Sequence, residues 1–222
     1  VVAMGLGAWH ILSRPDQVAG LPPSDARSLA PVPMAALPLR TLSYSLTVQK
    51  YRAGRPYREP FRLPGEMLFG PDDRVRLELS SAQDGHLYVI NEGPAPRGGS
   101  ASFNVLYPRA GDEGTTSAQL AAGGVISIPE GSWFAFDEEQ GTERLWLTWS
   151  AEPVPPLEAV KSLANPRDRG AVRDAVQAAA LEEFFRTRGA AAPEIVRDEQ
   201  ARRTVIRGDG PVLVALLKLE HH

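Results

Sequence analysis

Nucleophilic catalysis needs a histidine close to a serine or cysteine, and this sequence offers little to build such a site. The 222 residues include no cysteine and four histidines. His221 and His222 end the chain and are set aside, which leaves His10 and His86. No Gly-x-Ser-x-Gly sequence, the turn that exposes a nucleophilic serine in one large hydrolase class, is present. We therefore interpret His86 as a packed or strand-edge histidine, and serine hydrolysis is not expected.

Metal ligands are equally sparse. His10 and His86 are 76 positions apart, which gives no zinc-binding spacing. The acidic groups at 72–73, 112–113 and 137–139 lack the alternation of a calcium loop. We expect neither a metal nor another cofactor. The 27 acidic residues leave one enzymatic alternative open, a carbohydrate-active hydrolase with two facing carboxylates, which the sequence cannot pair.

Aromatic residues give a stronger indication of binding. In the segment 144–149, Leu145, Leu147 and Trp149 share one face of a predicted strand. Trp146 lies on the opposite face with Arg144, and an outward tryptophan beside an arginine is a stacking platform for a sugar, a peptide or a partner domain. A C-terminal helix that covers Trp146 is the alternative. The candidate binding residues are Trp146, Arg144, Trp133, Tyr88 and His86.

Alternating apolar and polar residues predict the strands that carry these side chains. The period of two begins at Leu42 and recurs along the chain to Trp149. Asp84-Gly85 predicts a hairpin turn, and both faces of the strand that follows it are apolar, as expected of a central strand. The predicted strands cover 41–48, 74–80, 86–91, 103–107, 125–128, 133–136 and 144–149.

The C-terminal part has a different pattern. Asn165-Pro166 predicts the start of an amphipathic helix over about 166–188. A closing hairpin over 195–219, with its turn at 208–210, follows. The fold class expected is α+β, predominantly β, with an antiparallel β-sandwich-like core, a C-terminal amphipathic helix and a closing β-hairpin. The apolar stripe predicted for the helix consists of Val172, Val176, Ala180, Leu181, Phe184 and Phe185.

The N-terminal 40 residues predict a tether. Residues 1–12 are almost wholly apolar but too few to span a bilayer, so they are interpreted as the end of a membrane anchor. An apolar segment docked on the domain is the alternative. Residues 13–40 contain six prolines and predict a semi-extended Pro/Ala spacer before a single β-rich domain at 41–220. The net charge of −3 gives no positive field for nucleic acid.

Five segments between 72 and 153, taken in their order, resemble a bacterial family of domains of unknown function. Members of that family often lie C-terminal to membrane-anchored Ser/Thr protein kinases and caspase-like peptidases. The resemblance implies a β-sandwich-like adaptor and supplies no catalytic residues. The segments are DDRVRLELSS (72–81), DGHLYVINEG (84–93), FNVLYPR (103–109), AAGGVISIPE (121–130) and GTERLWLTWSAEP (141–153).

The function expected from these observations is that of a non-catalytic, extracytoplasmic adaptor or sensor. Such a module would belong to a larger envelope or signalling system, periplasmic and membrane-tethered, although a cytoplasmic location stays open. Its partner would be a protein or an envelope component, and not a nucleic acid. The carbohydrate-active hydrolase and a purely structural spacer domain remain the alternatives.

Overall fold

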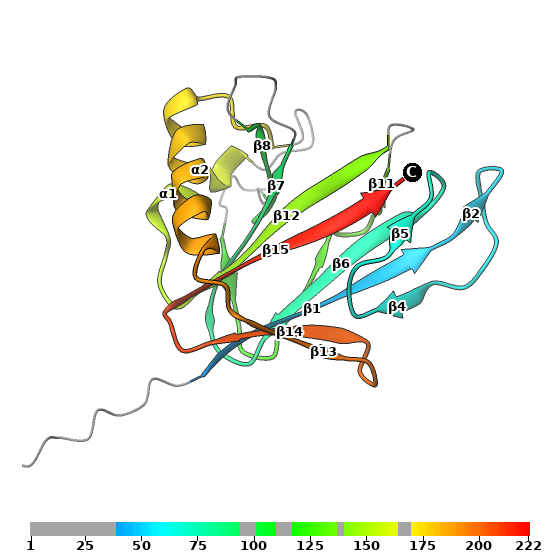
Figure 1. The fold of residues 1–222 in the computed structure, drawn as a ribbon, viewed down its shortest axis with the longest axis horizontal. Helices are drawn as coiled ribbons and strands as arrows, with labels where there is room; N and C mark the ends of the chain where they lie inside the picture. Colours follow the sequence, from blue (N-terminus) through cyan, green and yellow to red (C-terminus); the bar gives the residue numbers. More distant parts are fainter. Residues whose placement is uncertain (1–38, 94–100, 110–116, 137–139, 164–169) are drawn as a thin grey trace, which may run out of the picture. The chain divides into compact units, whose positions relative to one another are not determined.

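The computed structural model describes residues 39–93, 101–109, 117–136, 140–163 and 170–222 (Figure 1). The predicted anchor at 1–12 and residues 13–38 of the predicted spacer at 13–40 lie outside these residues, and Arg40 already belongs to the first strand. Within the described residues, no helix is long and apolar enough to cross a membrane. The domain is predominantly β with a C-terminal helix and closing strands, which confirms the predicted fold class.

The first sheet is built around β1. Alternate residues of this strand, among them Leu42, Leu46 and Val48, are buried. On one side β1 pairs along its length with β6, and on the other it pairs with β14 and then β4. The outer side of β6 carries β10 and β11. The strands are β1 (Arg40–Gln49), β4 (Phe61–Leu63), β6 (Arg74–Ser81), β10 (Val125–Ile128), β11 (Phe134–Ala135), β13 (Glu194–Asp198) and β14 (Arg203–Gly208).

The second sheet has β12 at its centre, paired antiparallel with β15 and β7. Strand β5 joins the far side of β15 in parallel, and β8 and β9 join β7. Its strands are β5 (Leu68–Phe69), β7 (Gly85–Glu92), β8 (Phe103–Tyr107), β9 (Gln119–Leu120), β12 (Gly141–Ser150) and β15 (Val212–His221). A separate small hairpin pairs β2 (Tyr51–Arg52) with β3 (Arg55–Pro56).

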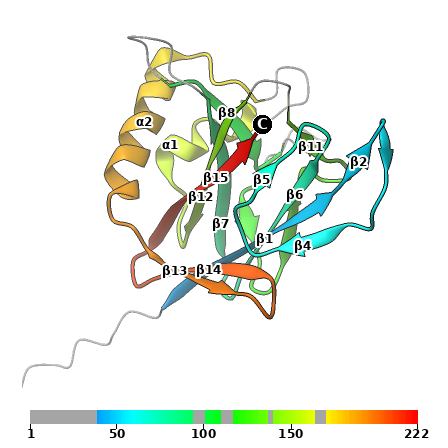
Figure 2. The ribbon, with the colours of Figure 1, turned by 45° about the vertical axis from the view of Figure 1, so that its right-hand side comes forward.

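Two hydrophobic cores hold these layers together. The larger core lies between the sheets and joins side chains such as Leu46 and Leu77 to Leu87, Leu147 and others. The smaller core lies on the outer face of the second sheet, beneath α1 (Pro155–Glu158), η1 (Lys161–Leu163) and α2 (Ala175–Gly189) (Figure 2). The second sheet is therefore covered on both faces, which explains why β7 and β15 are apolar on both sides.

Two predicted hairpin turns connect strands of different sheets. The Asp84-Gly85 turn leads from β6 in the first sheet to β7 in the second. The consecutive strands β11 and β12 also belong to different sheets, β11 to the first and β12 to the second. The turn at 208–210 likewise leads from β14 to β15, so the predicted closing hairpin over 195–219 is wrong in its pairing. The C-terminal hairpin is formed by β13 and β14.

Gly85 shows why one of these crossings needs glycine. A Cβ atom there would lie 2.6 Å from the Trp149 ring and from the backbone oxygen of Ser150. That separation is far inside van der Waals contact, so the crossing strand can approach β12 only without a side chain. The glycine that signalled a tight turn in the sequence therefore serves close packing between β7 and β12.

The C-terminal helix is shorter than predicted. It begins at Ala175, with Asp174 as its N-cap, and Asn165 lies outside the described residues. The Asp174 side chain accepts hydrogen bonds from the backbone N–H groups of Val176 and Gln177. Of the predicted apolar stripe, Leu181 and Phe185 are buried, whereas Val176 is 79% exposed. Val172, which precedes the helix, and Phe184 are partly buried and pack against the same core.

Candidate functional site

The predicted binding residues fall into two separate places. Trp146, Arg144, Tyr88 and His86 lie on the outer face of the second sheet, the side covered by the helices. Trp133 precedes β11 and lies beside Arg76 of the first sheet. The division of β12 into two faces was predicted correctly, because Leu145, Leu147 and Trp149 face the core between the sheets.

Trp146 is buried beneath α2 and is not an outward platform. Its indole stacks on the Phe185 ring with centroids 4.7 Å apart and planes 8° apart, and 9% of the residue is exposed. Its Nε1 donates to a Glu92 carboxylate oxygen at 2.5 Å, and the other oxygen lies 3.3 Å from Nε of Arg144. The ring of Trp146 therefore packs against α2, and its only polar atom is hydrogen-bonded to Glu92, so Trp146 has a structural role.

Tyr88 and His86 belong to a polar cluster under α1. The Tyr88 hydroxyl donates to Glu158 at 2.6 Å, and Lys161 pairs with the same carboxylate. Burial raises the pKa of Tyr88, and the hydrogen bond to Glu158 raises it further. Nδ1 of His86 is buried and has no hydrogen-bond partner within the part of the chain that the structure describes. Buried Tyr88 joins α1 to the sheet.

Trp133 is half-buried and stacks with an arginine. The Arg76 guanidinium carbon lies 4.3 Å from the centroid of the Trp133 ring. Nε and Nη2 of Arg76 also donate to the backbone oxygen of Ser132, at 3.1 and 3.0 Å. The segment before β11 is therefore fixed to β6 by both contacts. Trp133 lines the rim of a groove that the sequence did not predict.

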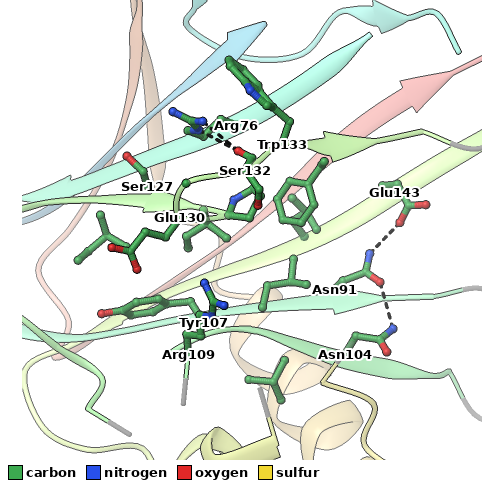
Figure 3. A pocket seen from close by; sticks show the side chains of 18 of the residues that line it. Arg76, Asn91, Asn104, Tyr107, Arg109, Ser127, Glu130, Ser132, Trp133 and Glu143 are labelled. Atoms are coloured by element: carbon green, nitrogen blue, oxygen red, sulfur yellow. Dashed lines mark hydrogen bonds between the residues drawn. The ribbon is translucent and has the colours of Figure 1, made fainter. Parts of the chain in front are cut away.

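This groove lies where the two sheets separate, between β10 and β11 of the first sheet and β7, β8 and β12 of the second (Figure 3). Its volume is about 1200 Å³, which is large for a small-molecule site and ample for part of a polymer. Apolar side chains of Leu106, Ile126, Ile128, Phe134, Phe136, Leu145 and Leu219 line its interior. The groove exists because β10 and β8 are edge strands that do not pair with each other.

One wall of the groove carries a chain of hydrogen bonds. Nδ2 of Asn104 donates to Oδ1 of Asn91 at 3.3 Å, and Nδ2 of Asn91 donates to Glu143 at 2.8 Å (Figure 3). These residues come from β8, β7 and β12. Asn91 lies on the inward face of β7 with Leu87 and Val89, and Glu143 lies on the inward face of β12 with Leu145 and Leu147. Polar side chains therefore replace apolar ones where the core opens into the groove.

The opposite end carries Tyr107, Arg109 and Glu130. Burial raises the pKa of the Tyr107 hydroxyl, and the negative charge of Glu130 raises it further. The hydroxyl therefore stays protonated and can act as a hydrogen-bond donor at neutral pH. Arg109 and Glu130 are exposed, and Figure 3 shows Arg109 close to the Tyr107 side chain.

Two glutamates line the groove, Glu130 and Glu143, and these are the residues that paired-acid hydrolysis would use. They lie toward opposite ends in Figure 3, and Glu143 is hydrogen-bonded to Asn91. The carboxylates do not point toward each other, as they would on the two sides of a scissile bond. Among the described residues, no group of three or more His, Cys, Asp or Glu side chains is placed to hold a metal ion.

The fold and groove define a β-sandwich-like domain with a helical layer on one sheet and an open edge between the sheets. Searches against protein-family models, curated proteins and solved structures found no match to this chain.

The sequence contained one signal that could have located the groove. Asn91 ends the predicted strand 86–91, and Glu143 directly precedes the predicted strand 144–149 on the face of Leu145 and Leu147. A polar residue at an inward position indicates either a buried hydrogen bond or an opening of the core. The other walls of the groove, however, come from β8, β10, β11 and β15, which are scattered along the sequence.

Proposed function

We propose that this domain is a non-catalytic protein-binding module, an adaptor or sensor, and that the groove is its main binding surface. The observation that carries the proposal is the groove itself, which has an apolar interior and hydrogen-bonding groups at both ends. Apolar walls with a few oriented polar groups are the usual composition of a recognition site. Tyr107, Arg109 and Trp133 are also of the residue types that are enriched at protein interfaces.

The arrangement of acidic groups supports binding over hydrolysis. A glycosidase needs one carboxylate to protonate the leaving group and a second one across the scissile bond. Glu143 is instead tied to Asn91, and Glu130 lies at the other end of the groove beside Tyr107. Both carboxylates are better placed to orient backbone or side-chain donors of a bound chain.

The wider setting of the module is part of the same proposal. The resemblance to the family found beside membrane-anchored kinases and caspase-like peptidases favours an adaptor within a larger envelope or signalling protein. The apolar segment 1–12 and the proline-rich segment 13–40 favour a membrane tether and an extracytoplasmic, periplasmic location.

A peptide selection tests the function and the surface together. Phage-displayed random peptides would be selected against the whole chain, and binding of the enriched peptides would be measured for groove variants. Tyr107→Ala and Arg109→Ala should weaken binding about tenfold each, because each removes a contact at the end of the groove. Arg186→Ala, an exposed change on α2, is the control and should leave binding unchanged.

Two results would contradict the proposal. Selected peptides whose affinity is unaffected by both groove variants would place the binding surface elsewhere. Release of reducing ends from a bacterial cell-wall polysaccharide, abolished by Glu130→Gln or Glu143→Gln, would identify a hydrolase.

A further inference from the structure

The outer face of the first sheet carries a group of arginines stacked on aromatic rings. Arg74 and Arg76 occupy alternate positions of β6 and pair across the sheet with Gln49 and Thr47 of β1. Their side chains therefore lie on the solvent side of the sheet, opposite the core residues Val75 and Leu77. We call Arg74, Arg76, Tyr51 and Trp133 the arginine face.

Stacking fixes the orientation of both guanidinium groups. The Arg76 guanidinium carbon lies 4.3 Å from the Trp133 centroid, and that of Arg74 lies 5.3 Å from the Tyr51 centroid. Each guanidinium lies over a ring; in Arg76 the Nε and Nη2 edge donates to the Ser132 oxygen, which leaves Nη1 and the outer N–H of Nη2 available for a ligand. The conformational entropy that an arginine normally loses on binding has then been lost already in the free protein.

The charge of these two arginines is not neutralised within the described part of the chain. Glu78, the next outward residue of β6, pairs with Arg62, and the buried Asp73 pairs with Lys50. No ion pair links Arg74 or Arg76 to a carboxylate of any described residue, and their hydrogen bonds within the described part of the chain go to the backbone oxygens of Asp73 and Ser132. The nearby β2–β3 hairpin adds Arg52, whose guanidinium carbon is 5.0 Å from the Tyr57 centroid.

The spacing of the two arginines matches an extended acidic chain. Alternate residues of a strand are about 6.6–6.8 Å apart on one face. An extended peptide with an acidic residue at every second position presents carboxylates at the same interval, and each carboxylate can accept two hydrogen bonds from a guanidinium. On the adjacent β1, Thr47 pairs with Arg76, and its short side chain is only partly buried, so it leaves room for a chain beside Arg76.

We propose that the arginine face binds an extended acidic segment of a partner protein, with carboxylates at alternate residues against Arg74 and Arg76. The proposal rests on the proposed binding function and names a class of partner for it. Since Arg76 and Trp133 also line the rim of the groove, the bound segment can continue into it. A nucleic acid is disfavoured because Glu78 and Glu130 lie beside this surface and the net charge is −3.

The test uses synthetic peptides with the whole chain. A peptide of alternating glutamate and serine is compared with a second peptide of the same composition in which the glutamates form one block. Arg74→Gln with Arg76→Gln should weaken binding of the alternating peptide by at least about tenfold, because two charge-assisted contacts are lost. Arg186→Gln with Arg188→Gln makes the same charge change at the same spacing on α2 and should leave affinity within about twofold.

A conservative variant separates geometry from charge. Arg74→Lys with Arg76→Lys keeps both positive charges and removes the planar, stacked forks, so intermediate weakening is expected. Chemical denaturation of each variant shows whether it is folded. If the glutamine variant does not fold, the comparison of binding is made with the lysine variant.

Several outcomes would overturn the proposal. These are equal binding of the alternating and block peptides, equal losses in the β6 and α2 variants, and full binding by the lysine variant. Tighter binding of heparin, or of vesicles that contain phosphatidylserine, would replace the partner class with a polyanion or a membrane. If only this proposal fails and the groove is still the binding surface, peptides whose affinity depends on Tyr107 will still bind.

Discussion

The sequence allows two interpretations of Trp146, an exposed binding platform or a side chain buried under a helix, and only its surroundings in the fold decide between them. Its position on β12 gives it an outward orientation from the second sheet, as the alternation predicts. Phe185 and Gly189 of α2 then cover it, and a Cβ on Gly189 would lie 3.0 Å from the indole. The sequence shows both the tryptophan and the amphipathic helix, but it does not show which part of the sheet the helix covers.

Trp146→Ala should therefore destabilise the fold instead of removing a binding platform. Loss of a buried ring and of its contact with Phe185 should lower the free energy of unfolding by about 3–5 kcal/mol. Trp133→Ala is the comparison, with an expected loss of about 1 kcal/mol or less because that ring is half-buried. Urea denaturation measures both. Similar losses in the two variants would contradict the difference in their positions.

The carboxylate of Glu158 couples stability to acid pH. Burial by itself would raise the pKa of Glu158, but hydrogen bonds from Lys161 and Tyr88 outweigh it, so the pKa is lowered from 4.5. A carboxyl group whose pKa is lower in the folded than in the unfolded state stabilises the fold when ionised. That contribution is complete above the unfolded pKa and is lost as the pH falls through the folded value.

Glu158→Gln should remove this pH dependence. The difference in unfolding free energy between the wild type and the variant should be largest near neutral pH and should shrink as the pH falls below 4.5. Urea denaturation at a series of pH values measures the difference. A difference that stays constant across the series would show that the charge of Glu158 does not contribute.

At the scale of elements, the longer strands were predictable and their partners were not. All seven predicted strands correspond to observed ones, from β1 to β12, because alternation follows directly from one buried face. The strands β4, β5, β9, β2 and β3 are two or three residues long, too short to show a period. A glycine turn has the same signature whether the next strand joins the same sheet or the facing one, so the sequence predicts hairpins at 84–85 and 208–210 where the chain crosses between sheets.

The start of α2 provides a prediction at the same scale. Asp174→Ala removes the side chain that accepts from two N–H groups at the helix N-terminus, and should lower the free energy of unfolding by about 1 kcal/mol. Asp209→Ala changes an exposed aspartate between β14 and β15 and should have an effect within about 0.5 kcal/mol. Thermal and urea denaturation measure the pair. A larger effect at Asp209 would contradict the N-cap assignment.

At the scale of the whole domain, strands from its two ends complete both sheets. Strand β1 pairs with β14 in the first sheet, and β12 pairs with β15 over ten residue pairs in the second. The groove depends on the same closure, since Leu219 of β15 lines its interior. The candidate site could not be predicted from local patterns because it forms only when these distant segments meet.

A chain that ends at Ser150 should consequently fail to fold. It would keep β1, β6, β7 and β12 but lose the helices and β13, β14 and β15, leaving one edge of β12 and the outer apolar face of the second sheet exposed. We expect no cooperative thermal transition by circular dichroism, whereas the whole domain should show one. A cooperative transition in the shortened chain would show that β15 is dispensable.

The location of β15 between β5 and β12 also affects the order of events during synthesis. Residues 212–221 leave the ribosome after all the other strands that the structure describes, so the second sheet stays incomplete until translation has passed them. Until then β12 presents an unpaired edge that is rich in apolar side chains. An unpaired edge of this kind is a template for pairing with another chain, so completion of β15 removes a site of aggregation.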